Sequence, residues 1–396
     1  MMGNEMVGNE AAGAGLRLSA LGRRIGGRWI VDGVDLSVAP GQTLCVVGPS
    51  GCGKTSLLRL VAGLDAAETG SVVVDGRDVT RLPPQQRPLA MVFQGESLFP
   101  ELSVAQNIAF GMAARGIAKQ QQREAVEVAM LRVGLTGLGD RLPHQISGGQ
   151  QRRVAVARAM VLRPSVLLLD EPMGGLDEVN RTQLSRQLHQ LARRGMTQDG
   201  SAQGPSGRGG GTTVVHVTHD QAEALSGGDL LAVMDQGRVM QLGTPVEVFT
   251  RPSSQRVAAF LGRSNFLQAD LVEVRGAPGS ASARIHVLGQ DLEVACHDGL
   301  LGKPQGEATL MVRPHAVRLA PPEAADFPLV RPREVHGEVG IVQRVAYLGD
   351  RLDLVVETDR GTVVVAGALD EPYRAGDGVR VQVLADRTWL LPVGQR

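Results

Sequence analysis

The chain has 396 residues, a length that predicts two or three domains at roughly 150 residues each and is ample for a hydrophobic core. Lysine and arginine together number 41, as do aspartate and glutamate, so the net charge of zero provides no overall attraction to nucleic acid or anionic lipid. The length of the chain excludes a disulfide-rich miniature scaffold. The three cysteines are an odd number without metal-ligand spacing, which indicates reduced thiols of a cytoplasmic protein.

The N-terminal residues 1–15 are small and polar. They lack the charged and apolar regions of a secretory signal, so we interpret them as a disordered extension. No run in the chain approaches the roughly 18 apolar residues that mark a membrane span. If the protein serves a membrane, we expect another chain to cross it.

Residues 16–262 alternate short apolar runs with longer helical segments, which predicts an α/β domain with a largely parallel sheet. The runs at 44–47 and 166–169 are apolar throughout, as strands buried on both faces are. The run at 214–217 is similar and is broken only by His216.

The second half of the chain changes in composition twice. Residues 195–211 are so rich in glycine and serine that we interpret them as a mobile surface insertion. Beyond residue 262 the sequence becomes a series of short β-branched stretches broken by Gly, Pro and Asp, which predicts a small all-β sandwich or barrel over 263–396. The expected strands are 283–288, 292–296, 309–313, 352–357, 362–366 and 379–384.

Residues 48–55 match the phosphate-loop pattern G-x-x-x-x-G-K-[ST], between an expected strand and an expected helix. Backbone N–H groups of such a loop surround phosphates, and the next helix presents its positive end to them. Lys54 is expected to reach the β and γ phosphates, and the Thr55 hydroxyl to bind Mg²⁺. The predicted nucleotide-binding residues here are Gly48, Pro49, Ser50, Gly51, Cys52, Gly53, Lys54, Thr55 and Ser56.

Two adjacent carboxylates, Asp170 and Glu171, follow the apolar run at 166–169. Asp170 can hold a Mg²⁺ shell, while Glu171 can orient an attacking water or accept its proton. Alone, a strand running into an acidic turn would be the simpler interpretation. The upstream phosphate loop favours a catalytic pair.

A second anion-binding segment is predicted at Ser147, Gly148, Gly149 and Gln150, ahead of a long helical stretch. Ser147 is a favourable N-cap, and the glycines leave backbone amides exposed at the positive end of the helix. A plain capped helix explains these residues equally well.

The order of these motifs resembles the ATP-binding subunits of ABC transporters, which have a P-loop NTPase domain with a helical subdomain. The resemblance covers residues 16–262, with the helical subdomain at about 95–163. Residues 263–396 resemble the TOBE-like module, an OB-like barrel, of importer ATPases of the polyamine, ferric-iron, sulfate and sugar type. The motifs are the phosphate loop, VFQ at 92–94, SGGQ at 147–150, LLDEP at 168–172, LD at 176–177, VTHD at 217–220, MVRP at 311–314 and YLGD at 347–350.

The resemblance implies roles for individual residues. Gln94 is similar to the glutamine that contacts Mg²⁺ and the attacking water, which makes it a metal ligand with Thr55 and Asp170. His219 resembles the histidine that contacts the γ-phosphate. The implied catalytic residues are Glu171, His219 and Gln94. Residues 147–150 resemble the signature that touches ATP on the other subunit. Asp177 resembles the residue that couples the two sites across the dimer.

The function implied is ATP hydrolysis by a homodimer that drives solute import through separate membrane permease subunits. The implied cofactor is Mg²⁺ with ATP, the implied location is peripheral, on the cytoplasmic face of the membrane, and an extracytoplasmic solute-binding protein is an indirect partner. The residues in and around the signature and the LLDEP motif resemble polyamine, ferric-iron or phosphonate importers more than sugar importers.

Two alternatives remain open. One is a soluble ABC-type ATPase that acts on nucleic acid or the ribosome, which the zero net charge and the β module oppose; we therefore expect no nucleic-acid partner. The other is a sensor in which residues 263–396 bind a solute.

Two departures from the family are visible: Ile25 stands where an aromatic residue usually stacks on adenine, and Gly174 and Gly175 replace Ser-Ala.

Overall fold

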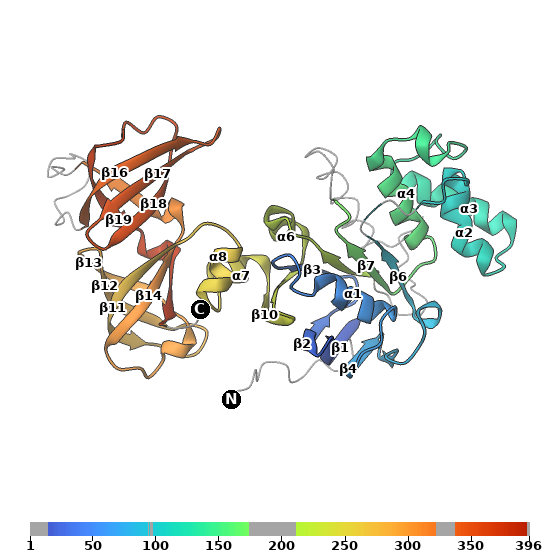
Figure 1. The fold of residues 1–396 in the computed structure, drawn as a ribbon, viewed down its shortest axis with the longest axis horizontal. Helices are drawn as coiled ribbons and strands as arrows, with labels where there is room; N and C mark the ends of the chain where they lie inside the picture. The colour runs from blue at the N-terminus through green and yellow to red at the C-terminus, as the bar shows by residue number, and fades with distance from the viewer. Residues whose placement is uncertain (1–14, 94, 96–97, 174–210, 322–336, 394–396) are drawn as a thin grey trace. The chain divides into compact units, whose positions relative to one another are not determined.

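The computed structural model describes residues 15–93, 95, 98–173, 211–321 and 337–393 (Figure 1). The chain forms two compact units that divide between Pro245 and Val246. The N-terminal unit combines helices with two sheets, and the C-terminal unit contains two further sheets. The predicted fold class, an α/β domain followed by a small all-β domain, is confirmed.

The central sheet of the N-terminal unit has six strands in the order β10-β9-β3-β8-β7-β6. Its strands pair in parallel except for β10, which is an antiparallel edge strand. Every residue of β3, β7 and β8 is buried, as their apolar runs predict. The bounds are β3 (Thr43–Val47), β6 (Leu89–Val92), β7 (Val166–Asp170), β8 (Thr213–Val217), β9 (Leu230–Asp235) and β10 (Arg238–Gly243).

This sheet separates two hydrophobic cores because successive side chains of a strand point to opposite faces. Leu167 and Leu169 of β7 pack into one core, and Val166 and Leu168 into the other. The first core is shared with three helices that lie together at one end of the unit (Figure 1). They form the predicted helical subdomain, whose bounds at about 95–163 stay a prediction. The helices are α2 (Val104–Ala114), α3 (Lys119–Arg132) and α4 (Gly148–Met160).

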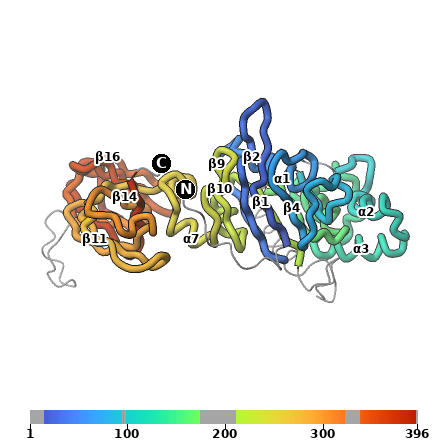
Figure 2. Tube along the Cα trace, turned by 90° about the horizontal axis from the view of Figure 1, so that it is seen from below, coloured from blue at the N-terminus to red at the C-terminus, as the bar shows by residue number. Residues whose placement is uncertain are grey.

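The second core is shared with α1 (Lys54–Ala62) and an antiparallel sheet of order β2-β1-β4-β5. Among the described residues, the largely parallel sheet predicted for this domain is therefore accompanied by an antiparallel sheet. Gly26 and Gly27, with φ of 58° and 80°, make the tight turn that returns the chain as a hairpin. Figure 2 shows this hairpin extending beyond the neighbouring strands. The bounds are β1 (Leu16–Ile25), β2 (Arg28–Val38), β4 (Thr69–Val74) and β5 (Arg77–Asp78).

The described part of the N-terminal unit also contains short helices. They are η1 (Pro84–Gln86), η2 (Pro143–Gln145) and α6 (Gln221–Gly227). None of the helices in the described part of the chain combines the length and apolarity needed to cross a lipid bilayer.

The C-terminal unit contains two antiparallel five-stranded sheets, β13-β12-β11-β14-β20 and β15-β19-β16-β17-β18, around one shared core. Its strands are β11 (Asn265–Arg275), β12 (Ser282–Val287), β13 (Gln290–Ala295), β14 (Gly306–Val312), β15 (Val317–Ala320), β16 (Glu338–Tyr347), β17 (Leu352–Thr358), β18 (Gly361–Gly367), β19 (Gly378–Val383) and β20 (Thr388–Pro392). Its helices are α7 (Pro245–Thr250), α8 (Gln255–Phe260), η3 (Asp298–Leu300), η4 (Pro314–Ala316) and η5 (Ala385–Arg387).

Arg313 fastens the segment containing α7 and α8 to the sheets. Its buried guanidinium donates to the backbone oxygens of Phe249, Ala258 and Gly262. This explains why the compact C-terminal unit begins before residue 262, where the family pattern ends. The predicted domain boundary at that residue stays a prediction.

Candidate functional site

The phosphate loop joins β3 to α1 and is pressed closely against two other strands. A Cβ on Gly48 would lie 2.0 Å from the carbonyl oxygen of Met234 on β9, and one on Gly53 would lie 2.3 Å from that of Ile30 on β2. Gly53 also has a φ of 107°. Only glycine fits these two positions, so close packing of the backbone explains why the phosphate-loop pattern has glycine at both of them.

Lys54 begins α1, and its ammonium lies inside the loop. Its Nζ donates to the carbonyl oxygens of Gly48, at 2.7 Å, and Pro49, at 3.1 Å. The residue is only 7% exposed. A buried cation at the positive end of a helix makes this loop a site for a multiply charged anion.

Thr55 and Asp170 meet across 115 residues of sequence. The Thr55 hydroxyl donates to Asp170 Oδ1 at 3.1 Å. Burial raises the pKa of Asp170; the hydrogen bond from Thr55 acts in the opposite direction, the neighbouring Glu171 charge raises it further, and Lys54 lowers it. Two oxygen ligands beside a phosphate loop form a donor set that suits a hard cation such as Mg²⁺.

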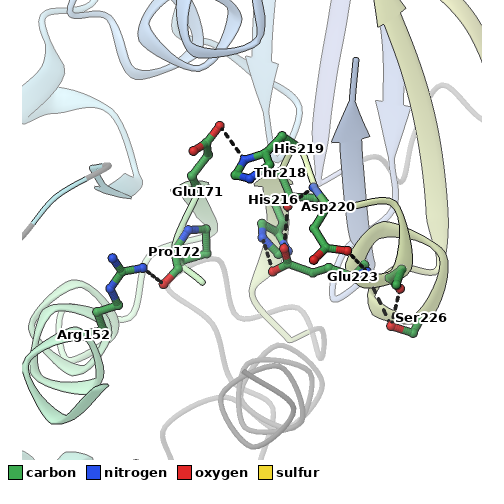
Figure 3. Close-up of polar contacts among 10 residues, drawn as sticks. Arg152, Glu171, Pro172, His216, Thr218, His219, Asp220, Glu223 and Ser226 are labelled. Atoms are coloured by element: carbon green, nitrogen blue, oxygen red, sulfur yellow. Dashed lines mark hydrogen bonds and ion pairs between the residues drawn. The ribbon is translucent and has the colours of Figure 1, made fainter. Parts of the chain in front are cut away.

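Glu171 and His219 face each other from the ends of the adjacent strands β7 and β8 (Figure 3). Glu171 Oε1 lies 3.2 Å from His219 Nδ1. Glu171 has a left-handed φ of 47°, unusual for a residue with a side chain, and its N–H donates to the Val217 carbonyl. The strand ends therefore bring the Glu171 carboxylate and the His219 imidazole close to Asp170, which is hydrogen-bonded to Thr55.

Ser147 caps α4 in a reciprocal capping box. Gln150 N–H donates to Ser147 Oγ at 3.3 Å, and Ser147 N–H donates to Gln150 Oε1 at 2.9 Å. Because α4 packs into the core on one face of the sheet and α1 into the core on the other, the two predicted anion-binding segments of a single chain belong to different faces.

A small pocket is lined by Glu171 and Pro172 together with residues of α4 and of the end of β6. It is lined by Phe93 and Arg152 among others, and the Arg152 guanidinium donates to the carbonyl oxygen of Pro172 at 2.7 Å (Figure 3). The site therefore has a direct link to the helix that Ser147 caps.

Several sequence predictions fall outside the described residues. They concern Gln94, Asp177, Gly174 with Gly175, residues 195–210 of the expected insertion and residues 1–14 of the expected extension.

Sequence reasoning missed a polar network directly behind His219. It consists of His216, Thr218 and Glu223, all buried. The available signal was His216 itself, a titratable residue interrupting an otherwise apolar strand. Its partner Glu223 could not be recognised, because it lies on the first turn of another element, α6.

Ile25 ends β1 with 55% of its surface exposed. Trp29 on the same hairpin stacks with Arg24, whose guanidinium carbon lies 4.0 Å from the ring centroid. The described hairpin thus presents an aliphatic side chain at the position predicted to meet adenine.

These features define the class of protein. A parallel sheet with a phosphate loop after one strand, and paired carboxylates after another, is the arrangement of a P-loop nucleotide-binding protein. The ABC transporter family matches residues 31–174, and the TOBE domain family matches residues 310–391.

Full-length relatives agree with these matches. Spermidine/putrescine import ATP-binding protein PotA of Marinobacter nauticus is 38% identical over 383 residues, 95% of each chain. Fe(3+) ions import ATP-binding protein FbpC 1 of Rhizobium meliloti is 37% identical, over 87% of this chain and 88% of the relative.

A solved structure shares the fold of the ATPase part. The structure of cbiO1 from Clostridium perfringens, part of the ABC transporter complex cbiONQ, superimposes with a TM-score of 0.53 at 27% identity. The match covers 60% of this chain and 92% of that one. The chain belongs to the ATP-binding subunits of ABC transporters, with a TOBE module following the ATPase domain, and its enzymatic activity is ATP hydrolysis.

Proposed function

We propose that this chain is the ATP-hydrolysing subunit of an importer and that it works as a homodimer with separate permease subunits. The observation that carries the assignment of hydrolysis is the 3.1 Å hydrogen bond between Thr55 and Asp170. It joins the phosphate loop to the strand end where Glu171 and His219 meet. The phosphate loop, the two proposed cation ligands and the pair proposed to act on water and the γ-phosphate therefore lie at one site.

ATP binds with its β and γ phosphates in the loop of residues 48–53. The Lys54 ammonium, which donates to the carbonyls of Gly48 and Pro49, exchanges these neutral acceptors for phosphate oxygens. Thr55, Asp170 and Gln94 would hold Mg²⁺. When bound, the ion offsets the negative charge of the phosphates.

Hydrolysis is assigned to Glu171 and His219. The carboxylate orients a water molecule in line with the γ-phosphorus and receives its proton, while the imidazole donates to a γ-phosphate oxygen. Water oxygen bonds to phosphorus as the bond to the β-phosphate oxygen breaks, leaving ADP and phosphate. The 3.2 Å separation of the two side chains supports their acting on one phosphate.

Dimerisation follows from the placement of the second anion-binding segment. Residues 147–150 and the phosphate loop belong to elements on different faces of one sheet. In the proposed dimer the segment of one copy meets the nucleotide held by the other, so a two-fold interface contains two identical sites. Asp177 couples the two sites.

Import is supported by the two relatives, PotA and FbpC 1, which are both import ATP-binding proteins. We assign the chain to the cytoplasmic face of the membrane, bound peripherally to a permease that receives cargo from an extracytoplasmic binding protein. The cargo is a polyamine or ferric iron; no relative described above supports phosphonate. The nucleic-acid alternative is opposed by the zero net charge.

The importer assignment is tested by isolating this chain with its partners from membranes of the producing organism. We expect two permease chains to accompany it, and vesicles containing the complex to accumulate labelled spermidine or ferric iron only when ATP is supplied. Lys54→Ala is the matched control and should abolish accumulation. Recovery of ribosomes or nucleic acid in place of permease would overturn the assignment.

The site assignment needs a separate measurement on the purified chain. Lys54→Ala should lose binding of a fluorescent ATP analogue. Glu171→Gln should keep that binding and lose phosphate release. Normal turnover by the Glu171 variant would remove this residue from its proposed role.

A further inference from the structure

A buried acid and a buried imidazole lie behind the tip of β8. Glu223 is 7% exposed and His216 is 4% exposed, and Glu223 Oε1 lies 3.1 Å from His216 Nε2. The two atoms meet at ion-pair distance without the alignment of a hydrogen bond. Burying two ionisable groups costs free energy unless they compensate one another, so such a pair needs a reason beyond filling space.

The second carboxylate oxygen of Glu223 holds the end of the strand. Thr218 Oγ1 donates to Glu223 Oε2 and accepts from the N–H of Asp220 at 3.0 Å. Asp220 Oδ1 in turn accepts from the N–H of Glu223 at 3.0 Å, capping α6. Figure 3 shows these contacts closing a ring between the strand end and the first turn of the helix.

His219 stands between Thr218 and Asp220 in the sequence, but its side chain takes no part in the ring and points away from it. Its neighbours Thr218 and Asp220 are both bonded within the ring, whereas its own side chain is 63% exposed and reaches Glu171. The backbone sets the direction of the Cα–Cβ bond of His219, from which the rotamers of the imidazole start. Fixing the residues on both sides removes freedom that would otherwise be lost on binding the transition state.

We infer that Glu223 is a positioning residue for hydrolysis, which aims His219 by holding Thr218 and His216 from α6. The inference rests on the role of His219 under the proposed function. A carboxylate suits this task because it accepts from the Thr218 hydroxyl with one oxygen and faces the imidazole with the other. Glutamine has the same shape but turns an N–H donor toward one of these partners.

The test is a double-mutant cycle on kcat for ATP hydrolysis in the full chain. Glu223→Gln should lower kcat by roughly 10- to 100-fold, the range expected when a reacting group is misplaced, and leave the affinity for ATP unchanged. His219→Ala should lower kcat at least as much. If Glu223 acts through His219, the double variant should equal His219→Ala alone. Independent, multiplying losses would overturn the inference.

A second pair of variants keeps the test valid if Glu223→Gln folds poorly. Thr218→Ser retains the hydroxyl and should keep most of the activity, whereas Thr218→Val matches its shape without the hydroxyl and should repeat the loss of kcat. Ser226→Ala, on the same helix but bonded only within it, is the control and should change nothing.

The outcomes distinguish the proposed role of His219 in hydrolysis from the positioning role of Glu223. Full activity of His219→Ala would reject the role given to His219 under the proposed function. Loss of activity in His219→Ala together with normal kcat in Glu223→Gln and Thr218→Val would reject the positioning role alone. A thermal unfolding midpoint measured for each variant distinguishes misplacement from loss of the fold.

Discussion

At the scale of single residues, the surface offered to the nucleotide base differs from the phosphate site. Lys54 and Thr55 are held by several contacts, but Ile25 is an exposed aliphatic side chain at the tip of a hairpin. Aromatic side chains contribute a stacking interaction with a base that an aliphatic one lacks. Phosphate contacts should therefore dominate nucleotide affinity.

We expect the variant Ile25→Tyr to bind ATP more tightly, by about 0.5–1.5 kcal/mol, because a ring can stack on adenine. Titration with ATP and GTP measures the change, and the wild-type chain should discriminate weakly between the two. Ile25→Leu is the matched control and should leave both affinities unchanged. A tyrosine variant with unaltered affinity would show that this hairpin does not meet the base.

The buried His216 gives a pH dependence of stability. Burial by itself lowers the pKa of this imidazole, but its interactions with Cys45 and Glu223 outweigh burial and raise the pKa to about 10. A raised pKa means that the folded state holds the proton more strongly than the unfolded chain. The stabilisation is complete below the ordinary pKa of about 6.5 and is lost as the pH rises through about 10.

We expect the unfolding midpoint in urea to fall between pH 7 and pH 10.5 and to fall less in His216→Gln, since the variant has no imidazole to titrate. Comparing the two chains removes the contribution of other groups that ionise in this range. His286→Gln, at a surface histidine, serves as the control and should follow the wild type. Parallel curves for wild type and His216→Gln would contradict the assignment.

At the scale of elements, Arg152 links α4 to the end of β7. Its guanidinium donates to the carbonyl oxygen of Pro172, directly after Glu171. In the proposed dimer, α4 serves one nucleotide through Ser147 while Glu171 serves the other. The hydrogen bond therefore joins parts of the two nucleotide sites within one chain.

We expect Arg152→Ala to reduce the cooperativity of ATP hydrolysis, seen as a Hill coefficient closer to one, with little change in the affinity of the isolated chain for ATP. The physical reason is loss of a rigid connection between α4 and the Glu171 turn. Arg123→Ala, an exposed residue of α3, is the control. Unchanged cooperativity in Arg152→Ala would remove the coupling role.

The success of sequence prediction for individual elements depended on burial. Strands β3 and β7 are buried on both faces, and their unbroken apolar runs identified them. By contrast, β16 was missed, because Val339 and Ile341 on its outward face are about half exposed and disrupt the expected alternation. The hairpin of β1 and β2 was missed because its turn is two glycines inside a charged stretch.

At the scale of the whole molecule, the proposed mechanism needs two copies. We expect Glu171→Gln with ATP and Mg²⁺ to elute at twice the chain mass of 41.8 kDa, because unhydrolysed ATP holds both subunits together. Light scattering after gel filtration measures this. ADP, or the second substitution Lys54→Ala, should return the monomer. A monomer at every concentration of the ATP-loaded variant would refute the shared nucleotide site.

The sequence by itself determined the family, through its ordered motifs, and the phosphate loop. The loop could be predicted because it consists of consecutive residues, and its glycines allow the backbone conformation that surrounds the phosphates. The family resemblance assigned Thr55 and Asp170 to one Mg²⁺ site and Glu171 and His219 to one catalytic site. Only the tertiary structure decided the direct contacts, which join Thr55 with Asp170, Glu171 with His219, and Glu223 with His216 and Thr218. These contacts depend on strand order, on register and on the packing of α6, and no local sequence pattern specifies them.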